Sequence, residues 1–144
     1  MSNKHLKWEN IITMLEKLIK NSYSPYSGIK VAAILISCKG SRYIGVNVEN
    51  ASYGLTECAE RVAVFNMVAS GEKCIESIFI ASNTTKPLPP CGACRQVIRE
   101  FAKLDTIVTS ISLTTKEVAQ WKLEDLLPYS FTKQYITRRE HSSE

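Results

Sequence analysis

The sequence predicts an α/β fold in which helices pack on a mixed β-sheet within one domain. The chain has 144 residues, of which 44% are hydrophobic, and this is enough to build one core. Segments with helical periodicity alternate with short apolar runs that are typical of buried strands. Since there is no internal repeat or low-complexity segment, we expect one domain over residues 1–136 and a flexible, polar tail over 137–144.

The expected elements follow in the order helix, strand, strand, helix, strand, helix, strand, helix. Apolar residues three to four positions apart predict an amphipathic helix over 5–21. Thr56 is a plausible N-cap for the second helix, which would end near Ser70 because Gly71 follows. The other expected elements are strands over 30–37, 43–48, 77–81 and 106–113 and helices over 91–103 and 123–127.

Charge and hydropathy exclude several classes of protein. The chain has 18 Lys and Arg against 14 Asp and Glu, and a net charge of +4 is too small to indicate nucleic-acid binding. The central apolar run, residues 31–36, is far shorter than the roughly 20 residues of a membrane span. The first residues lack the apolar segment of a secretory signal. We therefore expect a cytoplasmic protein with neither a membrane nor a nucleic acid as its partner.

The chain contains five cysteines, an odd number in a sequence without a secretion signal. This favours reduced thiols or metal-bound thiolates over a set of disulfides. Cys38 and Cys74 lie outside any paired motif. We expect both to be small, partly buried hydrophobic side chains, and we assign them no role.

The other three cysteines lie at the starts of two predicted helices. A helix N-terminus carries partial positive charge and lowers the pKa of a thiol there. Cys91 and Cys94 are three positions apart, so they share one face of their helix. Together with Cys58 they would provide three sulfur ligands for zinc and leave the fourth tetrahedral position open, as in catalytic zinc sites.

Glu60 follows Cys58 by two positions and could move protons beside a zinc-bound water without binding the metal. A ligand-x-Glu element followed by Pro-Cys-x-x-Cys is the pattern of zinc deaminases. Two alternatives are open. Cys91 and Cys94 could form a redox pair, which would leave Glu60 unexplained. A structural zinc would need a fourth ligand, and the histidines are His5 and His141, both in the terminal segments.

These motifs together resemble the small, three-cysteine type of cytidine deaminase, which is homotetrameric and acts on free nucleosides. The resemblance runs nearly from end to end and implies a three-layer α/β/α domain with a five-stranded mixed sheet. The matching segments are Ser-Pro-Tyr-Ser at 24–27, Asn-Val-Glu-Asn-Ala-Ser-Tyr at 47–53, Cys-Ala-Glu-Arg at 58–61, Pro-Cys-Gly-Ala-Cys-Arg-Gln at 90–96 and Leu-Leu-Pro at 126–128.

The resemblance also implies roles for the residues at the metal. Cys58, Cys91 and Cys94 would hold one zinc ion per chain, and Glu60 would be the proton shuttle. Arg61 resembles the family arginine that hydrogen-bonds the ligand thiolates and offsets their negative charge.

Further roles concern the substrate. Asn47 and Glu49 would hydrogen-bond the ribose, although Asn47 could instead bond its own backbone as a turn residue. Tyr53 would lie at the substrate, and Ile29 replaces the usual phenylalanine, so stacking on the base becomes aliphatic contact. Phe131 would reach over the pyrimidine of a neighbouring subunit, so that active sites are shared within the homotetramer.

The activity implied is the hydrolytic deamination of cytidine and 2′-deoxycytidine in pyrimidine salvage. A deaminase of a modified cytosine nucleoside such as blasticidin S shares these motifs and is the alternative. A deaminase of DNA or RNA bases would need a basic groove or an aromatic platform, and a nucleotide deaminase a phosphate loop. A zinc-stapled binding module without enzymatic activity is the alternative from a different class.

Overall fold

The computed structural model describes residues 6–136, which contain a five-stranded sheet of strand order β2-β1-β3-β4-β5. Strands β3 and β4 pair in parallel, and the other neighbouring strands pair antiparallel. The mixed five-stranded sheet is therefore confirmed. Its strands are β1 (Val31–Ser37), β2 (Arg42–Val46), β3 (Ile75–Ser82), β4 (Ala102–Ser112) and β5 (Val118–Lys122).

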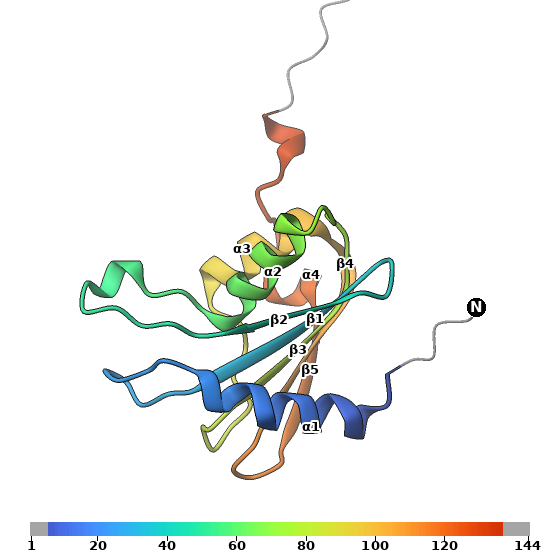
Figure 1. The fold of residues 1–144 in the computed structure, drawn as a ribbon. Coiled ribbons are helices and arrows are strands. Elements are labelled where there is room, and N and C mark those ends of the chain that lie inside the picture. Colours follow the sequence, from blue (N-terminus) through green and yellow to red (C-terminus); the bar gives the residue numbers. More distant parts are fainter. Residues whose placement is uncertain (1–5, 137–144) are drawn as a thin grey trace, which may run out of the picture.

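The helices cover both faces of this sheet. Figure 1 shows α1 on one face and α2, α3 and α4 on the other. Consecutive residues of β1 show the two sides, because Ile34 packs in the core under α1 and Leu35 in the core under α2 and α3. This confirms the three-layer architecture. The helices are α1 (Trp8–Leu18), α2 (Ala59–Ala69), α3 (Gly92–Phe101) and α4 (Leu123–Leu126).

Helix α2 lies directly on β2, and Gly45 is the point of closest approach. A Cβ atom added to Gly45 would meet the carbonyl oxygen of Ala59 and would lie 2.6 Å from the backbone nitrogen of Ala63. Helix and strand can approach this closely because glycine has no side chain. Gly45 therefore sets the position of the first turn of α2.

Two elements differ from the sequence predictions. Helix α2 begins at Ala59 with Cys58 as its N-cap, so the prediction of Thr56 as N-cap was wrong. Thr56 instead closes a 3-10 turn, where its N–H donates to the carbonyl of Tyr53. The residue pattern also missed β5, an edge strand whose side chains are exposed or half-buried in alternation and which pairs antiparallel with β4.

Cys38 and Cys74 form a disulfide, so the expectation of reduced, partly buried thiols was wrong for this pair. Both residues are exposed, and their Cα atoms lie 5.4 Å apart. The antiparallel register of β1 and β3 pairs Ser37 with Ile75, and the Cys38 N–H donates to the Cys74 carbonyl just beyond it. Strand pairing over 36 positions brings the two thiols together, and local spacing could not reveal this.

The described residues end at 136, so the tail predicted over 137–144 lies outside them. Within residues 6–136, no helix has both the length and the apolar character that crossing a membrane requires.

Candidate metal centre and adjoining pocket

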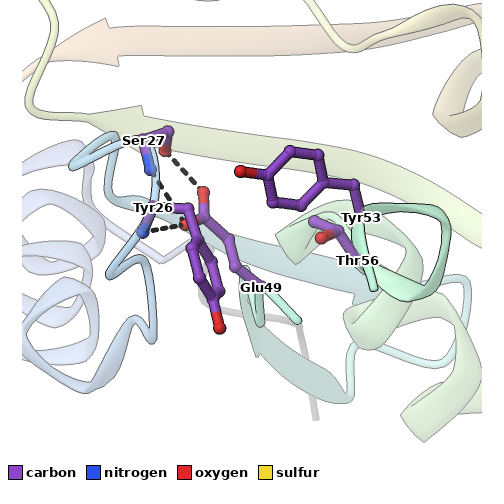
Figure 2. A pocket seen from close by; sticks show the side chains of 5 residues that line it. All are labelled: Tyr26, Ser27, Glu49, Tyr53 and Thr56. Atoms are coloured by element: carbon purple, nitrogen blue, oxygen red, sulfur yellow. Dashed lines mark hydrogen bonds between the residues drawn. The ribbon is translucent and has the colours of Figure 1, made fainter. Parts of the chain in front are cut away.

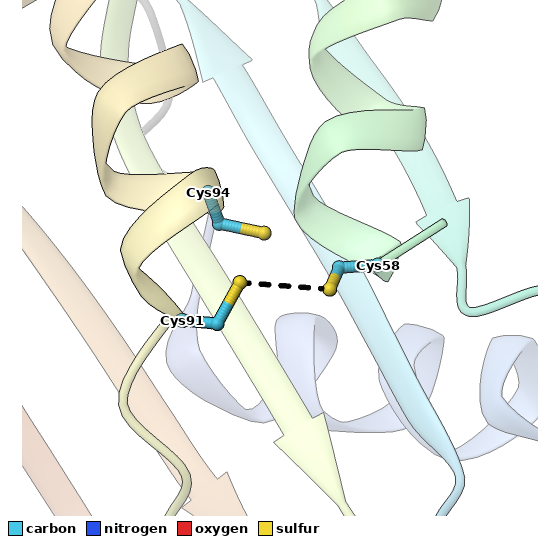
Figure 3. A group of neighbouring side chains, drawn as sticks. All are labelled: Cys58, Cys91 and Cys94. Atoms are coloured by element: carbon cyan, nitrogen blue, oxygen red, sulfur yellow. Dashed lines mark hydrogen bonds between the residues drawn. The ribbon is translucent and has the colours of Figure 1, made fainter. Parts of the chain in front are cut away.

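The starts of α2 and α3 bring three cysteines together. Cys58 is the N-cap of α2, Cys91 is the N-cap of α3, and Cys94 lies in the first turn of α3. Their sulfur atoms all lie within 4.8 Å of one another, and the Sγ atoms of Cys58 and Cys91 are 3.7 Å apart. Figure 3 shows the three thiols pointing toward a common centre.

This geometry fits zinc. Four ligands at about 2.3 Å from a tetrahedral zinc are separated from one another by about 3.8 Å, close to the distance between Cys58 and Cys91. Three sulfur donors suit zinc better than magnesium or calcium, which prefer oxygen. Cys94 is buried, Cys58 is half-buried and Cys91 is exposed, so the cluster is accessible from one side. The three predicted ligands are therefore brought together as a candidate zinc site.

The electrostatics of the cluster favour a thiolate at Cys58. A hydrogen bond with Cys94 and the donors of Arg61 lower the pKa of Cys58 to about 5, against the opposing effect of burial. The Nη2 atom of Arg61 lies 3.6 Å from the Cys58 sulfur, and its Nη1 atom pairs with Glu57 at 3.3 Å. The hydrogen bond with Cys58, together with burial, raises the pKa of Cys94. The guanidinium group of Arg61 thus lies beside the Cys58 sulfur.

Glu60 lies in the first turn of α2 with 6% of its surface exposed. Burial raises the pKa of its carboxyl group to about 7, and the nearby Cys58 sulfur adds to this. A carboxyl group with such a pKa both accepts and donates protons near neutral pH. Glu60 therefore has the properties of a general acid and base beside the cysteine cluster.

A cavity of about 390 Å³ is lined by Tyr26, Ser27, Glu49, Tyr53 and Thr56. Figure 2 shows the Glu49 carboxylate reaching the loop of Tyr26 and Ser27, with Tyr53 on its other side. The Oε1 atom of Glu49 accepts the N–H groups of Tyr26 at 2.9 Å and Ser27 at 3.1 Å, and Oε2 accepts the Ser27 hydroxyl.

These bonds, first that from the Ser27 hydroxyl, lower the pKa of Glu49. Thr56 connects this pocket to the cysteine cluster, since it precedes Cys58 by two positions and its carbonyl accepts a hydrogen bond from Arg61 at 3.5 Å. The pocket thus combines an ionised carboxylate with two aromatic rings, and Thr56 and Arg61 link it to the candidate metal centre.

Asn47 is not among the residues that line this pocket, and its side chain is engaged by its own chain. Its Oδ1 atom accepts the Val31 N–H at 2.9 Å and the Ser22 hydroxyl, and its Nδ2 donates to the Ile29 carbonyl at 2.8 Å. An amide group has two N–H donors, and the bond to Ile29 uses one of them. Asn47 ties the loop before β1 in place and thereby fixes the backbone of Ile29, whose side chain is exposed.

Phe131 lies elsewhere on the chain. Its side chain is 58% exposed, stacks on Tyr135 with ring centroids 5.8 Å apart, and is not among the residues that line the pocket. Its carbonyl accepts a hydrogen bond from Gln96 on α3. The structure therefore brings Glu49 and Tyr53 together in one pocket and places Phe131 outside it.

Sequence reasoning assigned no role to Ser27 and Thr56 in the pocket. Ser27 belongs to the segment at 24–27 that carried part of the family resemblance, and this was a usable signal. Thr56 could have been suspected from its position just before Cys58. The contact between Ser27 and Glu49 joins residues 22 positions apart, and only folding brings them together.

Comparison with known proteins decides the family. Residues 6–111 match the family model of the cytidine and deoxycytidylate deaminase zinc-binding region. The chain belongs to the cytidine deaminase family.

Relatives with this name match the chain over most of its length. The cytidine deaminase of Halalkalibacterium halodurans is 42% identical over 113 residues, which are 78% of this chain and 85% of that protein. The cytidine deaminase of Mycoplasma genitalium is 38% identical over 130 residues, or 90% and 97% of the two chains. The crystal structure of a cytidine deaminase from Burkholderia pseudomallei superposes with a TM-score of 0.81 at 38% identity and covers 88% of this chain and 100% of that one.

Proposed function

We propose that this protein is a zinc-dependent cytidine deaminase that hydrolyses cytidine and 2′-deoxycytidine to uridine and 2′-deoxyuridine, with release of ammonia. Its cellular role would be pyrimidine salvage in the cytoplasm. One observation supports this proposal above all: the cluster of Cys58, Cys91 and Cys94 lies next to the buried carboxyl group of Glu60. The relatives named cytidine deaminase support the choice of substrate.

Cys58, Cys91 and Cys94 would hold one zinc ion per chain. When bound, zinc supplies a Lewis acid that lowers the pKa of a water molecule. Three thiolates would leave the centre negatively charged, which opposes this effect. Arg61, with Nη2 at 3.6 Å from the Cys58 sulfur, would offset part of this charge.

Glu60 would carry both protons of the reaction. It would accept a proton from the attacking water as the water oxygen bonds to C4 of the pyrimidine, and deliver that proton to N3. It would then move the remaining proton of this oxygen to the amino group, which leaves as ammonia. The water oxygen stays on C4 as the carbonyl of uridine, so atoms and charge balance.

Glu49 and Asn47 would recognise the sugar. The carboxylate of Glu49 is held ionised and in place by Tyr26 and Ser27, so it could accept hydrogen bonds from ribose hydroxyls. The second N–H of the Asn47 side chain would add one donor. Tyr53 and Ile29 would contact the substrate from the loops on either side. This arrangement favours a nucleoside over a free base.

The protein would assemble as a homotetramer with shared active sites. The exposed Phe131 lies outside the pocket of its own chain, which is consistent with a role over the pyrimidine bound by a neighbouring subunit. We expect Phe131→Ala to raise KM for cytidine by about fivefold, because the loss of one aromatic contact costs roughly 1 kcal/mol. Light scattering should give the mass of four chains. A fully active monomer would contradict this part of the proposal.

The central experiment follows the absorbance of cytidine as zinc-loaded protein converts it to uridine. Wild type should be active, and Glu60→Gln should keep its zinc but lose activity by a factor of about 100–10,000, the usual contribution of a general acid and base. Glu100→Gln, the same change at an exposed position on α3, is the matched control and should match wild type. An active Glu60→Gln protein would contradict the shuttle. If zinc-loaded wild type is inactive on cytidine but active on blasticidin S, the modified nucleoside replaces cytidine as the proposed substrate.

A further inference from the structure

Helix α3 uses three polar side chains to hold the segment that follows α4. Arg95 donates from Nη1 to the Leu126 carbonyl at 2.8 Å. Gln96 donates to the Phe131 carbonyl at 2.9 Å, and Arg99 donates to the Ser130 hydroxyl at 3.0 Å. The helix that carries Cys91 and Cys94 at its start is thus joined along its length to the C-terminal part of the described chain.

Arg95 differs from the other two because its side chain also contacts the residue before Cys91. Its Nε donates to the Pro90 carbonyl at 2.7 Å. One planar guanidinium group therefore bridges the residue before Cys91 and the end of α4. The two donors of this group have a fixed relative orientation, which a flexible ammonium group cannot reproduce.

Both carbonyls need such a donor. The carbonyl at the end of a short helix has no partner within the helix, which applies to Leu126 at the end of α4. Helix α4 is itself anchored, since Leu123 and Leu126 are buried in the core. Pro90 is also buried. Arg95 thus connects the segment before Cys91 to a fixed point of the core.

Among the three cysteines, Cys91 has the weakest support from its surroundings. Cys94 is buried within α3, and Cys58 is half-buried with Arg61 beside it. Cys91 is exposed and directly follows Pro89 and Pro90, which have no N–H groups with which to bond the rest of the protein. The carbonyl oxygen of Pro90 is therefore an important site for a hydrogen bond to the rest of the protein, and the Arg95 side chain donates this bond.

We propose that Arg95 is a positioning residue for the metal centre, which holds the thiol of Cys91 in place by tying Pro90 to the end of α4. The proposal rests on the zinc site proposed above. It concerns the geometry of one ligand and assigns Arg95 no contact with substrate. Groups that orient metal ligands change metal affinity by about 10–100-fold when they are removed.

The test measures how fast zinc-loaded protein releases its metal to a chromophoric chelator. We expect Arg95→Gln to release zinc at least tenfold faster than wild type. Arg99→Gln is the matched control, because Arg99 contacts Ser130 and Ala102 but neither Pro90 nor Cys91. It should release zinc within twofold of the wild-type rate. Arg95→Lys keeps the charge but not the planar fork, and its rate should lie between those of wild type and Arg95→Gln.

Thermal unfolding of the metal-free proteins separates positioning from a general loss of stability. A stability role would lower the unfolding temperature of Arg95→Gln and Arg99→Gln alike and leave the two release rates equal, which would overturn the proposal. Wild-type release from Arg95→Gln would also overturn it. If Arg95→Gln does not fold, zinc release from Arg95→Lys at the wild-type rate would overturn the proposal.

This readout needs no substrate, so the two proposals can fail separately. A wild type that binds zinc but does not deaminate cytidine contradicts the proposed function alone. Unchanged zinc release from the Arg95 variants of an active enzyme contradicts the positioning role alone.

Discussion

The two groups of cysteines lie at opposite ends of α2 and differ in chemical state: three are free thiols and two form a disulfide. Cys58, Cys91 and Cys94 meet where α2 and α3 begin, with the guanidinium group of Arg61 close by. Cys38 and Cys74 meet beyond the end of α2, where β1 and β3 pair, and form a disulfide. A helix of 11 residues is about 16 Å long, so the two groups are well separated.

The surroundings explain this difference. Thiols at helix N-termini are stabilised as thiolates, and three of them converging on one point favour a metal. Two thiols facing each other across antiparallel strands lie at the separation that a disulfide requires. Backbone position, rather than residue type or number, thus decides what each cysteine does.

The strongest test of the comparison removes one cysteine of the cluster in one variant and both cysteines of the disulfide in another. Cys94→Ser should abolish zinc binding and activity, because two remaining sulfur ligands do not hold the ion. The double variant Cys38→Ser/Cys74→Ser should keep both. Metal content after dialysis and cytidine turnover measure the result. Loss of zinc in the double variant would show that the two groups are not independent.

The disulfide should affect stability instead. It joins residues 36 positions apart, and closing a loop of that size stabilises the folded chain by about 3–4 kcal/mol according to the chain-entropy relation. The double variant should therefore unfold roughly 10–13 °C below wild type when both carry zinc. Differential scanning calorimetry measures this shift. An unchanged transition would mean that the bond contributes nothing to the folded state.

Gly45→Ala should destabilise the packing of β2 against the start of α2, the end of the helix that carries Cys58. The added methyl group would meet Ala59 and Ala63, and overpacking of this kind costs about 1–3 kcal/mol. Gly54→Ala is the control, since no atom lies within 4 Å of a Cβ added there. Urea denaturation should show a lower midpoint for Gly45→Ala alone. Equal midpoints would show that α2 shifts freely on β2.

The smallest effect is expected from Arg61→Gln, which removes a positive charge beside the cluster without removing a ligand. We expect zinc affinity to fall by about tenfold, in the lower part of the range for groups that support metal ligands. Arg42→Gln, a change at an exposed residue of β2 whose guanidinium group contacts the sulfur of Met14 on α1, should have no effect. Competition with a chelator of known affinity measures both. Unchanged zinc affinity in Arg61→Gln would contradict the view that Arg61 offsets the negative charge of the thiolates.

The residue pattern predicted most of the fold because helices and strands leave periodic signals in neighbouring residues. The amphipathic spacing of the first segment became α1, and the apolar run at 31–36 became the centre of β1. The pattern missed β5, whose short, half-exposed sequence carries little signal without its partner strand. The expectation of a fifth strand came from the family resemblance.

The sequence by itself determined which residues could form the metal centre, because Cys58, Cys91 and Cys94 are marked by their spacing at predicted helix starts. Tertiary structure alone decided that Cys38 pairs with Cys74, that Asn47 is engaged by Ser22, Ile29 and Val31, and that Arg95 bridges Pro90 and Leu126. The physical reason is the range of the contacts. Spacing within one helix turn is a local property, whereas strand register and hydrogen bonds between distant segments exist only once the chain has folded.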